Sequence, residues 1–113
     1  MLARFIATVC VIGMTAFAAN AAPSQEDGMS GLHAKVRIGG KLCMADHFHH
    51  GKSSGAASRK AAEASAMRDW AEFTAWEYSG AWGSYLLAVS KTMTCTQSGA
   101  TWGCSVSARP CRR

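Results

Sequence analysis

Three of the four histidines in this 113-residue chain fall within the stretch ADHFHHGKSSG, beside Asp46. Imidazole and carboxylate groups are ligands that Zn and Cu accept in proteins. If residues 43–50 are extended, alternation places His47 and His49 on one face, about 7 Å apart, and His50 on the other. One interpretation is therefore a Zn or Cu site whose ligands come from Asp46, His47, His49 and His50, with His33 as a further donor.

The same stretch has two other interpretations. Its glycine and serine content favours a solvated loop, in which two or three ligands do not define a metal site. Imidazoles also titrate near pH 6.5, so the four histidines can add up to four charges as the pH falls. The sequence favours the solvated loop without a cofactor, and a pH response remains a hypothesis.

Catalytic groups form a weaker pattern. No serine lies in a nucleophile elbow, and no free thiol remains if the mature cysteines are oxidised. A small basic hydrolase could use two histidines and a lysine for acid–base chemistry, and His33, Lys41 and His47 would then be the residues to test. Because nothing in their spacing favours this arrangement, we expect no catalysis.

Aromatic and basic side chains supply a candidate partner surface. Six aromatic residues lie within the 16 positions from Trp70 to Tyr85. Trp70 and Phe73 lie on the apolar stripe of a predicted helix, which indicates core positions, whereas Trp76 and Trp82 flank that stripe and are candidates for exposure. The terminal ARPCRR adds Arg109, Arg112 and Arg113. Such a surface suits an envelope protein, a glycan or a polyanion, and no motif indicates nucleic acid.

The N-terminal segment has the layout of an export signal. A single basic residue, Arg4, precedes the uncharged apolar run from residue 5 to 18, and Ala-Asn-Ala follows. This pattern predicts a signal peptide over residues 1–21, and the run is too short to span a bilayer. Its removal would lower the formal net charge from +5 to +4 and the cysteine count from five to four, with no membrane span remaining. Four cysteines in an exported chain of this size indicate two disulfides and a periplasmic or secreted location.

The rest of the chain predicts a disordered lead over residues 22–31 and a single α+β domain over residues 32–113. Alternation in LHAKVRIGGKLCM indicates a strand that is interrupted by a bend or bulge at Gly39-Gly40. Residues 59–78 are rich in helix formers, with Ser58 as the N-cap and Gly80 as the left-handed C-cap. The expected fold is one long helix packed on a small antiparallel sheet with a C-terminal β-hairpin, stabilised by disulfides.

The C-terminal hairpin has a predictable register. Gly99-Ala100 suits a two-residue type II′ turn, which pairs Ser98 with Thr101 and places Cys95 directly opposite Cys104. Continuing outward, the same register pairs Met93 with Val106 and Val89 with Pro110. A Cys95–Cys104 disulfide is preferred for this reason and leaves Cys43–Cys111, although sequence alone leaves three connectivities open.

Three stretches carry a resemblance to a known group: HFHHGKSSG, DWAEFTAWEYSGAW and TWGCSVSARPC. Together they resemble small exported proteins of alphaproteobacteria. The resemblance implies an envelope location and carries no activity with it. The interpretation that follows is a small disulfide-stabilised envelope protein with a binding or structural role, with metal binding through the histidine stretch as the alternative.

Overall fold

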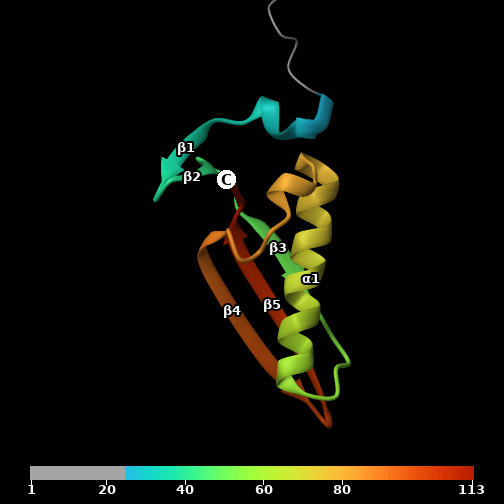
Figure 1. The fold of residues 1–113 in the computed structure, drawn as a ribbon. Helices are drawn as coiled ribbons and strands as arrows, with labels where there is room; N and C mark the ends of the chain where they lie inside the picture. The colour runs from blue at the N-terminus through green and yellow to red at the C-terminus, as the bar shows by residue number, and fades with distance from the viewer. Residues whose placement is uncertain (1–24) are drawn as a thin grey trace, which may run out of the picture.

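A computed structural model describes residues 25–113, so the predicted signal peptide and residues 22–24 lie outside the described part. The fold is α+β, as expected, but it contains two antiparallel three-stranded sheets in place of one. The larger sheet has the order β3-β5-β4 and the smaller one β1-β2-β6. The helix α1 lies along one face of the larger sheet, and the smaller sheet lies beyond one end of the larger sheet (Figure 1). The elements are η1 (Gln25–Leu32), β1 (Lys35–Ile38), β2 (Lys41–Met44), β3 (His49–Lys52), α1 (Arg59–Tyr78), η2 (Gly80–Trp82), β4 (Val89–Ser98), β5 (Thr101–Arg109) and β6 (Cys111–Arg112).

The helix α1 begins and ends close to where its sequence predicts. The Ser58 hydroxyl accepts a hydrogen bond from the Ala61 amide at 3.1 Å, which satisfies one of the free N–H groups of the first turn. The expected left-handed cap at Gly80 is wrong, because Ser79 takes the positive φ of 102°. The short helix η2 begins immediately afterwards at Gly80, so the chain reverses one residue earlier than expected.

The buried stripe of α1 consists of residues four positions apart, which are Ala62, Ala66, Trp70, Thr74 and Tyr78. The core expectation is confirmed for Trp70 and wrong for Phe73, which lies beside the stripe and is 43% exposed. Gly51 of β3 allows the close approach of helix and strand, because a Cβ there would lie 2.2 Å from the Ala66 carbonyl oxygen. The small stripe residues and this glycine let α1 pack directly against the strand backbone.

The C-terminal hairpin confirms most of the predicted register. Ser98 pairs with Thr101, Cys95 with Cys104 and Met93 with Val106. The Cys95–Cys104 disulfide joins two directly opposite residues whose Cα atoms are 4.1 Å apart. The expected pairing of Val89 with Pro110 is wrong, because a bulge after Val89, with Ser90 at φ 53°, shifts Val89 opposite Arg109.

The smaller sheet arises from two features that the sequence left open. Gly39 and Gly40 both have positive φ, 55° and 77°, so they form a tight turn and the predicted interrupted strand becomes the β1–β2 hairpin. After Pro110 the chain leaves the larger sheet and pairs as β6 with β2, which places Cys43 opposite Cys111. The Cys43–Cys111 disulfide confirms the second predicted bridge, with Cα atoms 4.0 Å apart.

The segment expected to be a disordered lead contains η1 in its described part. Gly28, at φ 50°, packs against the end of α1, where a Cβ would lie 2.9 Å from the Glu77 carbonyl oxygen. Ser30 is buried, and its carbonyl oxygen accepts a hydrogen bond from Lys35 Nζ at 2.7 Å. The glycine that made this segment look unstructured is the residue that permits its contact with the helix.

Candidate functional site

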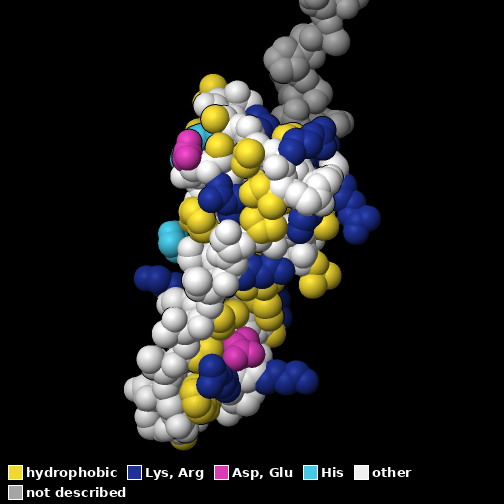
Figure 2. Space-filling model, turned by 90° about the vertical axis from the view of Figure 1, so that its left-hand side faces the viewer, with side chains coloured by type: hydrophobic (Ala, Val, Ile, Leu, Met, Phe, Trp, Pro, Cys, Tyr) yellow, Lys and Arg dark blue, Asp and Glu magenta, His cyan; other side chains and the backbone are white. Residues whose placement is uncertain are grey.

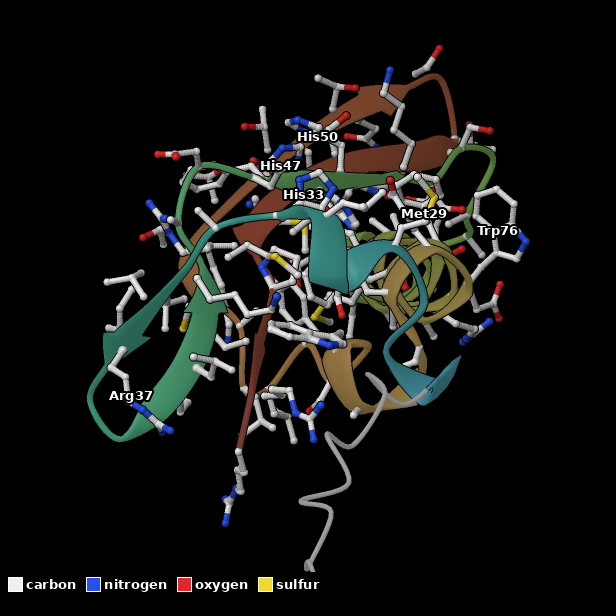
Figure 3. The ribbon with its side chains drawn as sticks, turned by 90° about the horizontal axis from the view of Figure 1, so that it is seen from above. Met29, His33, Arg37, His47, His50 and Trp76 are labelled. Atoms are coloured by element: carbon white, nitrogen blue, oxygen red, sulfur yellow. A yellow bond between two sulfur atoms is a disulfide. The ribbon has the colours of Figure 1, made fainter. Side chains whose placement is uncertain are left out.

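The histidine stretch is not the uniformly solvated loop that the sequence favoured. Residues His49–Lys52 of this stretch form β3, and His49 points inward and is only 5% exposed. His47 and His50 are exposed, and the His47 ring lies 3.9 Å from the His33 ring, centroid to centroid. His33, His47 and His50 all lie near enough to His49 to affect its pKa, and Figure 3 labels these three in the view from above.

Four residues of the last turns of α1 contact the His49 ring. Its Nδ1 lies 2.8 Å from Thr74 Oγ1, and its Nε2 lies 3.0 Å from a carboxylate oxygen of Glu77. The ring stacks on Tyr78 at 4.6 Å with an interplanar angle of 22°, and Phe73 contacts it at 4.9 Å. Thr74, Glu77 and Tyr78 are at positions i, i+3 and i+4 of α1, so they lie on one face of the helix. The sequence analysis did not connect this face to the histidine.

The hydroxyl group of Thr74 can hydrogen-bond to either the neutral or the charged form of His49. Thr74 Oγ1 lies 2.7 Å from the Trp70 carbonyl oxygen as well as near His49 Nδ1. When Thr74 donates to Trp70, Nδ1 must donate to Thr74, and the Nε2 proton that faces Glu77 then makes the ring an imidazolium. When Thr74 donates to Nδ1 instead, the ring is neutral and Nε2 still donates to Glu77. The ring can therefore change charge without losing either hydrogen bond.

Burial decides which state is favoured. Desolvation lowers the pKa of His49 below 6.5, and the Glu77 carboxylate opposes this by favouring the charged ring. The neighbouring His47, His50 and His33 lower it further when they are charged. Burial and Glu77 also raise the pKa of Tyr78, which keeps its hydroxyl protonated. The net effect is a lowered pKa, which favours the neutral form of His49.

The Thr74–His49–Glu77 arrangement has the residue types of a nucleophile, a base and an orienting acid. Thr74 is fully buried, however, so a substrate cannot reach its hydroxyl. The other candidate catalytic group, Lys41, lies elsewhere and donates through Nζ to the Leu87 carbonyl oxygen at 2.9 Å. We therefore interpret the buried arrangement as a structural hydrogen-bond network.

The predicted metal ligands are divided rather than gathered. His49 is committed to Thr74 and Glu77, His50 lies on the opposite side of β3, and His47 contacts His33. Within residues 25–113, no three His, Cys, Asp or Glu side chains are grouped so that they could hold a metal ion. The geometry therefore lends no support to the metal-site interpretation of Asp46, His47, His49 and His50.

The five residues predicted as a partner surface do not form one exposed surface. Trp76 is exposed, at 80%, on the last turns of α1, whereas the expectation of an exposed Trp82 is wrong because that ring is 1% exposed. Arg109 is structural, since its guanidinium donates to the carbonyl oxygens of Met44 and Ala45. Arg112 lies over the Trp82 ring at 5.9 Å from its centroid, and Arg113 is exposed at the chain end.

The smaller sheet is rich in basic residues, which lie on both of its faces. We call it the basic sheet, and it consists of β1, β2, β6 and the terminal residue, with Lys35, Arg37, Lys41, Arg112 and Arg113 as its charged residues. No acidic residue lies in these strands. The ion pairs His49–Glu77 and Arg59–Glu63 lie outside it. Figure 2 shows Lys and Arg interleaved with hydrophobic side chains over this upper part of the molecule.

A second surface was missed by sequence analysis. The face of the larger sheet turned away from α1 carries hydroxyl side chains along β4 and β5, and we call it the hydroxyl face. Its members are Thr92, Thr94, Thr96, Ser98, Thr101, Ser105 and Ser107. Alternate threonines in TMTCTQS were the available signal, since residues i and i+2 of a strand share a face.

Comparisons with protein-family models, with curated proteins and with solved structures found no match. The fold and its surfaces define a small disulfide-bonded α+β protein. Its two disulfides suggest an oxidising compartment. No helix in the described range is long and apolar enough to cross a membrane.

Proposed function

We propose that this protein is a non-catalytic binding protein of the cell envelope that attaches to an anionic phospholipid surface through the basic sheet. The carrying observation is the concentration of five Lys and Arg residues in a sheet without acidic residues, next to exposed leucine. A juxtaposition of cations and exposed apolar side chains is typical of proteins that bind membrane surfaces peripherally.

Charge at this surface is available for a partner. Arg37 and Arg113 are exposed, and neither guanidinium makes a hydrogen bond or ion pair within the described residues. Arg37 lies near the tip of the β1–β2 hairpin, at the periphery of the molecule (Figure 3). Phosphate groups accept hydrogen bonds from guanidinium and ammonium groups, and each cation close to an anionic membrane contributes about 1 kcal/mol.

Apolar groups lie beside this charge. Leu86 is 87% exposed, in the turn that precedes β4. Lys41 binds this turn to the β1–β2 hairpin through the Leu87 carbonyl oxygen. A hollow of about 450 Å³ lies between them, lined by Gly39, Gly40, Lys41, Leu86, Leu87 and Arg113. The hollow combines two cations with two leucines, which matches a phosphate headgroup and the upper part of its acyl chain.

The test is co-sedimentation with vesicles of phosphatidylglycerol and with vesicles of phosphatidylcholine. We expect binding to the first alone, and weaker binding as salt increases. Arg37→Gln with Arg113→Gln should weaken binding about thirtyfold, at roughly 1 kcal/mol per cation. Leu86→Asn should weaken it further without changing the salt dependence.

The matched control is Lys60→Gln with Arg68→Gln, which removes the same charge from exposed positions on α1. This control should bind nearly as the unchanged protein does. Equal weakening by both pairs would mean that net charge rather than the basic sheet is responsible. Binding to phosphatidylcholine, or to neither vesicle, would overturn the proposal.

A further inference from the structure

We propose that the hydroxyl face is a second binding site, and that its ligand is an acidic polysaccharide whose sugars carry carboxylate groups. This inference is independent of the attachment proposed for the basic sheet, because the two surfaces belong to different sheets. It rests on the register of the hairpin, on the hydroxyl groups that the protein leaves free, and on a hollow with a single charged residue.

The register brings the hydroxyls into a regular array. Thr92 lies opposite Ser107, Thr94 opposite Ser105, and Ser98 opposite Thr101. Directly paired residues share a face of the sheet, so these side chains point away from α1 together. Along each strand the rows repeat about every 6.7 Å, and neighbouring strands lie about 4.8 Å apart.

Most of these hydroxyls have no partner in the described part of the chain. Thr101 donates to the Ser98 carbonyl oxygen at 3.1 Å, and the other six hydroxyls make no hydrogen bond among the residues that the structure describes. Each can both donate and accept. A ligand that offers many hydroxyl groups can satisfy them in either direction, which a purely anionic ligand cannot do.

A hollow of about 440 Å³ lies on this face, a size suited to one or two sugar rings. One wall is the segment after β3, residues 53–55, which runs close over β5. Gly103 permits this approach, because a Cβ there would lie 2.8 Å from the Ser53 carbonyl oxygen. Ser53 fixes the wall by donating to the Ala62 carbonyl oxygen and accepting from the Cys104 amide.

Lys52 is the charged residue among those that line the hollow. Its backbone amide donates to a carboxylate oxygen of Asp69 at 2.8 Å, which holds this part of β3 in place. Its ammonium group makes no ion pair in the described structure. One cation among hydroxyls matches a sugar chain with one carboxylate per ring, whereas nucleic acid or a densely charged polyanion would require more cations.

The experiment uses calorimetry of the whole mature protein with an oligogalacturonate and with its methyl-esterified form, which has the same rings without the charge. We expect binding to the acidic form to exceed binding to the ester by about tenfold, the value of one charge-assisted hydrogen bond. Lys52→Gln should abolish that preference. Thr94→Val with Thr96→Val should weaken both ligands by roughly tenfold, since it removes two hydroxyls while keeping the strand propensity.

The matched control is Thr92→Val, which removes a hydroxyl of the same face outside the hollow and should leave binding unchanged. Equal binding of the two ligands would overturn the acidic assignment and leave a site for neutral glycans. No binding of either ligand would overturn the site itself. Loss of binding in the Arg37→Gln/Arg113→Gln protein, with no loss in the threonine variants, would assign the glycan to the basic sheet instead. The glycan titration and the vesicle assay are separate measurements, so either proposal can fail while the other holds.

Discussion

At the hairpin end of the molecule α1 packs on β3, β4 and β5 through small apolar side chains, whereas at the small-sheet end the interior is aromatic and polar. The first core consists of Ala62, Ala66, Trp70, Ala88, Cys104, Val106 and Ala108. The second core is centred on Met44, Tyr78 and Trp82. The polar residues His49, Thr74 and Ser30 are also buried at this end of the molecule. The difference separates a core that is indifferent to pH from one that contains a titratable ring.

Hydrogen bonding follows the same division. Trp70, in the first core, donates through Nε1 to the carbonyl oxygens of His49 and Ala108. Four buried polar atoms lack a partner within the described residues, and all belong to residues that contact the small-sheet end: Ser30 Oγ, Tyr78 Oη, Trp82 Nε1 and Arg109 Nε. Unpaired buried groups lower stability, so we expect the small-sheet end to depend more on its covalent bridge.

Removal of each disulfide should expose this difference most strongly. Cys43→Ala with Cys111→Ala opens a loop of 68 residues, and Cys95→Ala with Cys104→Ala opens one of 9. The chain-entropy model then gives losses of about 4 and about 2.5 kcal/mol in the free energy of unfolding. Urea denaturation of both double variants measures the two values. A larger loss from the short-loop bridge would show that the hairpin, rather than the small sheet, depends on its bridge.

Acidification should destabilise the protein through His49. Because burial places the folded pKa below the unfolded value of 6.5, the unfolded state binds the proton first as the pH falls. The contribution of His49 to the free energy of unfolding should therefore be constant well above pH 6.5 and decrease as the pH falls toward the folded pKa. Melting temperatures measured from about pH 8 to about pH 5 would show this decrease.

The variant His49→Gln should flatten that pH dependence, because glutamine keeps a donor but does not titrate in this range. The matched control is His50→Gln, which changes the exposed neighbour and should preserve the decrease. Stability that rises on acidification in the unchanged protein would mean that the ion pair with Glu77 outweighs burial.

The smallest expected effect is that of Tyr78→Phe at the small-sheet end, and Trp70→Phe in the first core serves as its comparison. Tyr78→Phe removes a buried hydroxyl without a partner and keeps the ring that stacks on His49, so the free energy of unfolding should stay equal or rise by up to about 1 kcal/mol. Trp70→Phe removes two hydrogen bonds and leaves a cavity, and should cost about 3 kcal/mol. Urea denaturation of both variants decides the sign. A clear loss from Tyr78→Phe would show that this hydroxyl has a partner in solution.

Local chemistry explains which elements could be predicted. The N-cap at Ser58, the helix that follows it and the turn at Gly99 all depend on residues within a few positions of one another. The register from Ser98 to Met93 follows from the turn by counting, and with it the Cys95–Cys104 bridge. The counting fails at Val89, where a bulge inserts one extra residue that no local pattern marks.

The candidate surfaces depended on longer-range contacts. The alternation of threonines in β4 was visible, yet only the placement of α1 on the other face decides that these hydroxyls face solvent. Trp82 looked exposed because it follows the helix, but the small sheet covers it with Leu42 and Met44 alongside. The exposure of Trp76 was predictable from its position off the stripe of α1.

By itself the sequence determined the α+β class, the long helix, the C-terminal hairpin and a bridge between its strands, because helix caps, turn residues and strand alternation act over short distances. Only the tertiary structure decided that residues 35–44 fold back as a hairpin, that β6 crosses to pair with β2, and that His49 is buried while its neighbours are exposed. Burial and pairing across 68 residues depend on which surfaces meet in three dimensions. That information is distributed over the whole chain and is not contained in any one stretch of it.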